Sequence, residues 1–485
     1  MRDMVLILNY DSAGSRAVAR ALRAEHIYCR IVNPDITRQE VDALQPLGLI
    51  LSGSVNGSLT KAPSGELTDG TWPVLALGDA AASLCTALGG DAQETVICGS
   101  IGAVAFTPCP LTGGIEQCER MLRNVRRLRL PDCVRPLAVS REENVGWMHR
   151  DLPLFGIQFS MEPNDTDGMQ LLLNFALIIC GCTRWWSTDV LIDQTVAELK
   201  EQVGSGRALC AVTGGLNSAV SALLAQRALG DRLQCIFIDT GLMRENEGSD
   251  FLNCYRDRMN LNITHVQAQD RFLSALQDIT DPAEKRRVIA ECLQATLDET
   301  VKGLGRFEVI LRSTTCNDIL NGSTLETHPG LRGNALTLEP LKELFKEEVR
   351  DAGERLGMPD EMLWRQSFPG SGLALRILGE VTPARLQTLR TADMLFTDEV
   401  EKAGLARRMR QYFAVLSPLP GNASRSVIVL RAVQHGDPAQ KAYAARLPFD
   451  LMERVTENIL RQRPEVERVV YDLSPSTHNQ NVEWQ

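Results

Sequence analysis

Residues 208–224 constrain the fold of this chain more strongly than any other segment. Their sequence, ALCAVTGGLNSAVSALL, begins as a short apolar strand and continues as a helix, with Gly214 and Gly215 between the two. Because glycine has no side chain, the backbone of such a loop approaches an anion closely. The N–H groups at the start of the helix then face the anion, and Thr213 and Ser218 add hydroxyl donors. The segment therefore predicts a loop that holds the phosphates of a nucleotide.

Two well-known nucleotide motifs are absent from this loop. The pattern G-x-x-x-x-G-K-[ST] is missing, which counts against a P-loop kinase or GTPase, and the G-x-G-x-x-G pattern of dinucleotide-binding folds is missing too. Taken alone, two glycines at this position fit a tight strand-to-helix turn without a ligand equally well. The rest of the chain has to decide between these interpretations.

Length and composition predict a globular protein of several domains. The 485 residues exceed what one compact core holds, and we expect three domains. Hydrophobic residues at 44% and charged residues at 23% are typical of globular proteins. The net charge of -10 counts against a nucleic-acid or anionic-membrane surface, because such partners select clusters of Lys and Arg.

The cysteines and the N-terminus indicate a cytoplasmic protein. The thirteen cysteines include no C-x-x-C pair, so the sequence indicates neither a zinc site nor a disulfide framework. The first residues, MRDMVLILNY, begin a strand without a signal-peptide cleavage site, and the apolar residues 169–182 are too few to span a bilayer. We therefore expect a soluble chain in a reducing cytoplasm.

Short apolar runs that alternate with helical patterns predict two α/β domains with parallel sheets, followed by an α+β domain. The first ends before a helix capped by Ser187 or Thr188, and the second ends at the glycine- and proline-rich residues 368–372. The predicted domains are residues 1–187, 188–368 and 369–485. The predicted strands are residues 4–8, 48–51, 73–77, 96–98, 126–130, 154–159, 208–212, 234–238, 307–311, 426–433 and 466–472.

Several motifs resemble those of a known family. The loop T-G-G-L-N-S at residues 213–218 resembles the S-G-G-x-D-S loop of ATP pyrophosphatases, which bind ATP and release pyrophosphate while adenylylating an acceptor. Further segments are similar to GMP synthetase, in the same order along nearly the whole chain: residues 235–248, 270–276, 339–349, 376–381 and 483–484. The resemblance implies a class I glutamine amidotransferase-like domain, an ATP pyrophosphatase domain and a C-terminal α+β dimerisation domain, and hence a homodimer.

The resemblance also implies an activity. In this family glutamine hydrolysis yields ammonia, ATP adenylylates the xanthine oxygen of XMP, and ammonia displaces AMP to give GMP with the help of Mg²⁺. Asp239 and Asp318 could instead serve only in a turn or a cap, but loops after parallel strands line the ligand crevice, which favours the functional role. The sequence identifies no metal ligands. The implied nucleotide-binding residues are Thr213, Gly214, Gly215, Leu216, Asn217, Ser218, Ala219, Asp239, Arg244 and Asp318.

The glutaminase residues of the family are largely missing. Such a site needs a cysteine on a sharp strand-to-helix turn, a histidine that takes its proton and a carboxylate that orients the histidine. Gly78 stands at the cysteine position, Ser160 replaces the histidine, and Glu162 is retained. Cys85 lies two turns into the following helix and is expected to be a buried small residue. Without nucleophile and base the covalent route is lost, so we predict no glutaminase activity.

The synthetase half departs from the family pattern less severely. Asn217 replaces an aspartate of the phosphate loop, residues 313–318 lack a family glycine and proline, and Glu326 replaces a lysine. Two functions remain open: an ammonia-dependent GMP synthetase, and a catalytically silent nucleotide-binding paralogue that pairs with or regulates a true synthetase. A sulfur-inserting tRNA enzyme shares the loop, but the acidic charge and the missing C-x-x-C pair count against it.

Overall fold

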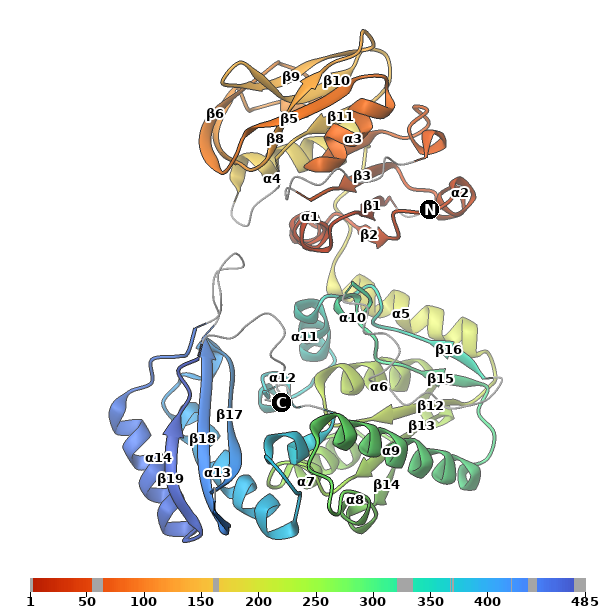
Figure 1. The fold of residues 1–485 in the computed structure, drawn as a ribbon. Helices are drawn as coiled ribbons and strands as arrows, with labels where there is room; N and C mark the ends of the chain where they lie inside the picture. The colour runs from red at the N-terminus through yellow and green to blue at the C-terminus, as the bar shows by residue number, and fades with distance from the viewer. Residues whose placement is uncertain are drawn as a thin grey trace. The chain divides into compact units, whose positions relative to one another are not determined.

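The computed structural model describes residues 3–54, 64–159, 165–320, 335–366, 368, 370–419, 421–434 and 443–474. The chain divides into two compact units, Met1–Leu191 and Ile192–Gln485. The first contains a large mixed sheet and a two-stranded ribbon, and the second contains a parallel sheet and a smaller mixed sheet (Figure 1). Within the described residues, no helix combines the length and the apolar character needed to cross a membrane.

The large sheet of the first unit has a parallel half and an antiparallel half. The strand order is β2-β1-β3-β4-β11-β10-β9-β6-β7, and the strands from β2 to β11 are parallel. The expectation of a parallel sheet is therefore correct for only half of it. The bounds are β1 Val5–Asn9, β2 Cys29–Val32, β3 Gly48–Ser52, β4 Val74–Leu77, β6 Ser100–Phe106, β7 Gln117–Leu122, β9 Val134–Ser140, β10 Glu143–His149 and β11 Leu154–Ile157, with β5 Asp91–Ile97 and β8 Val125–Arg129 in the ribbon.

The helices of the first unit begin where the sequence supplies a cap. The Asp11 carboxylate accepts a hydrogen bond from the Gly14 N–H at 2.7 Å and caps the start of α1. In contrast, α3 starts directly after Gly78, with no capping side chain from that residue. The helices are α1 Ser12–Ala24, α2 Arg38–Leu44, α3 Asp79–Ala87 and α4 Thr166–Leu173, and α4 continues as a π-helix over Asn174–Ile179.

The second unit begins with a five-stranded parallel sheet in the order β14-β13-β12-β15-β16. Helices α6 and α9 cover opposite faces of this sheet (Figure 1). The strands are β12 Ala208–Val212, β13 Leu233–Asp239, β14 Ile263–Gln267, β15 Val309–Leu311 and β16 Leu336–Leu338. The helices are α5 Thr188–Val203, α6 Leu216–Leu229, α7 Glu247–Leu252, α8 Gln269–Ala275, α9 Pro282–Leu304, α10 Cys316–Leu320, α11 Lys346–Arg355 and α12 Asp360–Leu363.

A three-stranded sheet follows in the same unit. Strand β18 (Asn422–Gln434) pairs antiparallel with β17 (Met409–Leu419) and parallel with β19 (Val466–Tyr471). Helices α13 (Pro383–Lys402) and α14 (Phe449–Gln462) pack together on one side of it (Figure 1).

The predicted second and third domains share a hydrophobic core in the structure. One cluster of buried side chains joins Phe272 and Ile289, from the parallel-sheet part, to Leu389 and Phe396 of α13. Because these two parts are packed into one unit, the domain boundary near residue 368 stays a prediction.

Candidate nucleotide-binding site

The glycine loop, residues 213–216, connects the end of β12 to the start of α6. Gly214 has a φ of 82°, a left-handed conformation that glycine adopts without strain. The Thr213 N–H donates to Ser218 Oγ at 3.2 Å, and the Ser218 hydroxyl donates to the Gly215 carbonyl at 3.0 Å. Gly215 is the N-cap and supplies no side-chain oxygen to the first turn of α6. The positive end of this helix therefore lies at the glycine loop without a capping side chain, as a phosphate site requires.

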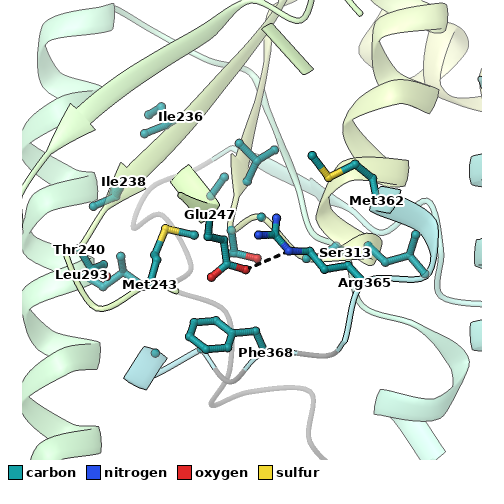
Figure 2. Close-up of a pocket in the computed structure, with 18 of the residues that line it drawn as sticks. Ile236, Ile238, Thr240, Met243, Glu247, Leu293, Ser313, Met362, Arg365 and Phe368 are labelled. Carbon is teal, nitrogen blue, oxygen red and sulfur yellow. Dashed lines mark ion pairs between the residues drawn. The ribbon is translucent and has the colours of Figure 1, made fainter. Parts of the chain in front are cut away.

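The glycine loop forms one wall of a cavity in the second unit. All four loop residues line it, and Thr240 and Met243 add a wall from the segment after β13. Figure 2 shows Ile236, Ile238 and Leu293 on the same side of the cavity as Met243. An apolar end beside a loop of backbone N–H groups matches the base and the phosphates of a nucleotide. The apolar side chains of the lining include those of Val212, Ile236, Ile238, Leu293, Leu297, Ile310 and Leu311.

Four basic side chains also line this cavity: Arg312, Lys346, Arg350 and Arg365. Lys346 and Arg350 lie four residues apart on α11 and therefore share one face of the helix. Desolvation by the surrounding protein, with the charge of Arg350 as the second cause, lowers the pKa of Lys346, although much of this residue is exposed. Burial also lowers the pKa of Arg350. An anionic ligand would stabilise the charged forms of both side chains.

One buried carboxylate, that of Glu247, lies among these cations. Arg365 Nε lies 3.5 Å from Glu247 Oε1, and the Arg244 backbone N–H donates to Oε2 at 3.0 Å. Figure 2 shows this ion pair in the middle of the cavity, near the ring of Phe368. Because Glu247 is paired and is the one carboxylate of the described lining, the cavity carries an excess of positive charge.

Four of the ten predicted nucleotide-binding residues line the cavity, namely the four residues of the glycine loop. Ser218 and Ala219 are buried in α6. The Ser218 hydroxyl fixes the shape of the loop, because its hydrogen is already directed to the Gly215 carbonyl. Asn217 is half-buried in the first turn of α6 and lies outside the lining. Contact of these three side chains with a nucleotide stays a prediction.

The remaining three predicted residues also lie outside the lining. Asp239 accepts a hydrogen bond at 2.9 Å from the backbone N–H two residues later, which shapes the turn after β13. Asp318 accepts from the N–H and the hydroxyl of Thr315 at 2.8 and 2.7 Å and so caps α10. Arg244 directs its Nε to Asp393 at 3.0 Å. For Asp239 and Asp318, the turn and cap roles considered in the sequence are the ones with contacts in the structure.

The basic side chains are the functional candidates that sequence reasoning missed. Lys346 lies in residues 339–349, which we identified by their resemblance without assigning it a role. The spacing of Lys346 and Arg350 was an available signal, because it places two cations on one face of a helix. Arg312 follows β15 and Arg365 follows α12, and nothing in the local sequence distinguishes them from surface arginines.

A second strand–glycine–helix turn lies in the first unit, between β4 and α3. Gly78 has a φ of 60° and occupies the N-cap of α3. The N–H of the next residue, Asp79, donates to the Ser54 carbonyl at 2.7 Å, and the Gly53 N–H donates to the Leu77 carbonyl at 3.1 Å. A Cβ atom on Gly78 would lie 2.5 Å from the Ser54 carbonyl oxygen and 2.7 Å from that of Gly53. The segment after β3 therefore packs on this turn and leaves no room for a side chain.

The structure describes only one of the other residues named for a glutaminase site, Cys85. Cys85 is buried in α3, as expected, and burial raises the pKa of its thiol to about 11, with Cys133 as a second cause. Ser160 and Glu162 lie outside the described residues, as do Glu326 and residues 475–485. The predictions made for those positions stay predictions.

Comparisons with known proteins identify the family. The family model described as GMP synthase C terminal domain matches residues 398–484. A curated relative from Caldanaerobacter subterraneus, named GMP synthase, glutamine-hydrolyzing, is 34% identical over 513 residues, which cover 100% of this chain and 99% of the relative. The chain belongs to the GMP synthase family. A relative of the same name from Symbiobacterium thermophilum is 34% identical over 518 residues, with the same coverage of both chains. The resemblance inferred from the motifs and the predicted α/β fold class are therefore confirmed.

Proposed function

We propose that this member of the GMP synthase family catalyses the ATP-dependent amination of XMP to GMP, with ammonia rather than glutamine as the nitrogen source. Similarity to glutamine-hydrolyzing GMP synthases over the whole chain supports the reaction. The observation that carries the assignment is the cavity in which the glycine loop meets four basic side chains. We also propose a homodimer formed through residues 369–485, the predicted dimerisation domain.

ATP would bind with its base at the apolar end of the cavity and its phosphates on the glycine loop. The purine ring would lie against isoleucine and leucine side chains, including Ile236, Ile238 and Leu293. The N–H groups of the first turn of α6 would face the phosphates, and Lys346 and Arg350 would offset their charge. The acceptor would bind on the side of Arg312 and Arg365.

The proposed reaction proceeds in two steps. The xanthine oxygen of XMP attacks the α-phosphorus of ATP, the bond from this phosphorus to the bridging oxygen breaks, and pyrophosphate leaves. Ammonia then attacks the adenylylated purine carbon, loses a proton and displaces AMP, which gives GMP. Negative charge develops on the pyrophosphate in the first step, so cations and N–H donors at the glycine loop stabilise the transition state more than the ground state.

The described residues bring no cluster of metal-binding side chains to this cavity. Among them, no group of three His, Cys, Asp or Glu side chains is placed to hold a metal ion, and the carboxylate of Glu247 is paired with Arg365. Mg²⁺ commonly binds through substrate phosphates with few protein ligands. Any Mg²⁺ in this cavity would therefore arrive bound to ATP, and we assign no step of the reaction to it.

The first unit would not supply the ammonia. A nucleophile on such a turn needs a side chain, and the N–H of the residue after it stabilises the oxyanion. Gly78 offers no nucleophile, and the Asp79 N–H donates to the Ser54 carbonyl instead. The Cys85 thiol, with a pKa raised to about 11, stays protonated at neutral pH. Ammonia would have to come from solution or from another protein.

Pyrophosphate release tests this proposal. The full-length chain is mixed with ATP, Mg²⁺ and XMP, and either ammonium chloride or glutamine is added. With ammonium we expect pyrophosphate and GMP in equal amounts, whereas with glutamine we expect neither GMP nor glutamate.

The outcomes separate the alternatives. Glutamate produced from glutamine would contradict the proposal for the first unit. ATP binding, measured by calorimetry, without pyrophosphate release under any condition would favour the silent nucleotide-binding paralogue. A chain that binds no ATP would refute both the enzyme and the nucleotide-binding paralogue.

A further inference from the structure

Helix α13 lies against the segment that follows β13, residues 240–246, which we call the β13 loop. Arg390 of α13 donates its Nε–H to the Met243 carbonyl at 2.8 Å and its Nη2–H to the Gly241 carbonyl. A single guanidinium group therefore holds the backbone of the β13 loop at two points. A lysine could not reproduce this, because its ammonium lacks the planar fork of the guanidinium.

Two neighbouring side chains of α13 extend this contact along the β13 loop. Gln387 Nε2 donates to Glu245 Oε2 at 3.1 Å, and the Asp393 carboxylate lies 3.0 Å from Arg244 Nε. Because the three α13 residues are spaced three apart, they share one face of the helix. That face contacts the β13 loop at Gly241, Met243, Arg244 and Glu245.

The opposite side of the β13 loop faces the proposed nucleotide pocket. Thr240 and Met243 line the cavity, and Met243 Cε lies 3.4 Å from the position that a Cβ atom on Gly214 would take. No residue of α13 belongs to the described lining of the cavity. The β13 loop therefore separates α13 from the pocket and contacts both.

The environment of Arg390 indicates a specific contact rather than a surface ion pair. Its side chain is half-buried, and burial is the main cause that lowers the pKa of its guanidinium. The charges of Glu245 and Asp239 oppose this shift. A cation is placed in such surroundings at a cost, which its bonds to backbone carbonyls offset.

We infer that Arg390 is a positioning residue of the nucleotide pocket. It does not touch the nucleotide, but it fixes the backbone of Gly241 and Met243 so that Thr240 and Met243 form the wall beside the glycine loop. This inference rests on the proposed nucleotide pocket. It means that the nucleotide affinity of this chain depends on a residue from the predicted C-terminal domain.

Calorimetric titration of the full-length chain with ATP and Mg²⁺ tests the inference. We expect Arg390→Met to raise the Kd for ATP about tenfold, equivalent to about 1.4 kcal/mol, and Arg390→Lys to raise it less. In turnover, KM for ATP should rise while kcat and KM for ammonium stay unchanged. The matched control is Arg385→Met, because Arg385 also lies on α13 but donates to the Glu380 carbonyl at 2.9 Å rather than to the β13 loop.

Hydrogen exchange provides a readout that does not need a ligand. Arg390→Met should accelerate exchange of the amides of residues 240–246 and leave those of β17 unchanged. An unchanged Kd in both Arg390 variants would overturn the inference, and so would an equal loss of ATP affinity in Arg385→Met. If Arg390→Met does not fold, the Kd of Arg390→Lys tests the inference instead. A wild-type chain that binds no ATP would instead refute the proposed nucleotide pocket itself.

Discussion

The chain contains two strand–glycine–helix turns that share a backbone design and differ in what surrounds them. In both, a glycine with positive φ lies between a parallel strand and a helix, with a φ of 60° at Gly78 and 82° at Gly214. Gly78 directly follows β4 and is the N-cap of α3, whereas Thr213 separates β12 from Gly214 and Gly215 is the N-cap of α6. At Gly78 the carbonyl oxygens of Gly53 and Ser54 fill the space in front of the turn. A Cβ atom on Gly214 would lie 3.4 Å from Met243 Cε, which is an ordinary van der Waals contact, and the loop borders a cavity.

This difference shows that the shape of such a turn is not sufficient for a site. A turn of this kind binds or reacts when its N–H groups are free to meet a ligand and when space is left for that ligand. The turn at Gly78 keeps its shape, but the Asp79 N–H donates within the protein at 2.7 Å. The glycine loop keeps both the space and the cations that suit phosphates. Three predictions test this contrast.

The largest effect is expected from Gly78→Cys. The new side chain would meet two backbone carbonyl oxygens in a left-handed conformation, and we expect a loss of about 2–4 kcal/mol in the free energy of unfolding of the first unit. Urea unfolding followed by tryptophan fluorescence reports mainly on this unit, because it contains four of the six tryptophans, Trp72, Trp147, Trp185 and Trp186.

The matched control for this substitution is Gly99→Cys. Gly99 has a φ of 66°, close to that of Gly78, but no atom of the described residues lies within 4 Å of its Cβ position. The control therefore measures the left-handed strain without the contact, and we expect a loss of only about 1 kcal/mol. Equal losses in the two variants would mean that the turn at Gly78 is not closed. Glutamate production by a Gly78→Cys, Ser160→His chain would contradict the closed turn directly.

The second largest effect is expected from Gly215→Ala, which changes the glycine loop. Gly215 has a negative φ, and its Cβ position lies 3.6 Å from Thr213 Oγ1, so alanine fits the backbone. The methyl group would keep phosphates away from the loop, and we expect the Kd for ATP to rise about tenfold or more, at least about 1.4 kcal/mol. Gly303→Ala, on α9 and outside the cavity, should leave the Kd unchanged. An unchanged Kd in Gly215→Ala would refute the proposal that the phosphates of ATP bind at the glycine loop.

The sequence predicted the parallel strands of the fold better than the antiparallel ones. Strands β1, β3, β4, β12 and β13 are buried almost throughout and read as continuous apolar runs. Strand β7 alternates exposed and buried residues, and its pattern is too short and too polar to identify without the partner strands. The sequence also could not show that residues on both sides of position 368 share one core.

The sequence predicted the local part of the candidate site and missed the rest. Gly214 and Gly215 were found because a loop between a strand and a helix is visible within a few residues. Lys346 and Arg350 reach the same cavity from α11, more than 100 residues later, and only the fold brings them together. The sequence also could not predict that the space in front of Gly78 is filled, because the backbone carbonyls of Gly53 and Ser54 fill it and only the fold brings them there.

The smallest effect is expected in the pH dependence of ATP binding, which we attribute to the charge of Lys346. Its charged form would hold the phosphates, and burial together with Arg350 lowers its pKa below the ordinary lysine value of 10.5. The wild-type affinity for ATP should therefore fall as pH rises through this lowered pKa, earlier than an ordinary lysine would lose its charge. The phosphates of ATP are already fully ionised in this alkaline range, so they do not add to the change.

Titrations with ATP at pH 7.5 and 9.5 check this expectation. We expect the wild-type Kd to rise about threefold between the two values, equivalent to about 0.7 kcal/mol. Lys346→Met should bind more weakly at pH 7.5 and show a flatter pH profile, because the titrating charge is gone. Lys342→Met serves as the control, since Lys342 is exposed, precedes α11 and lies outside the cavity lining. A pH profile that is unchanged in Lys346→Met would show that another group titrates, and the charge of Lys346 would then not contribute to ATP binding at the glycine loop.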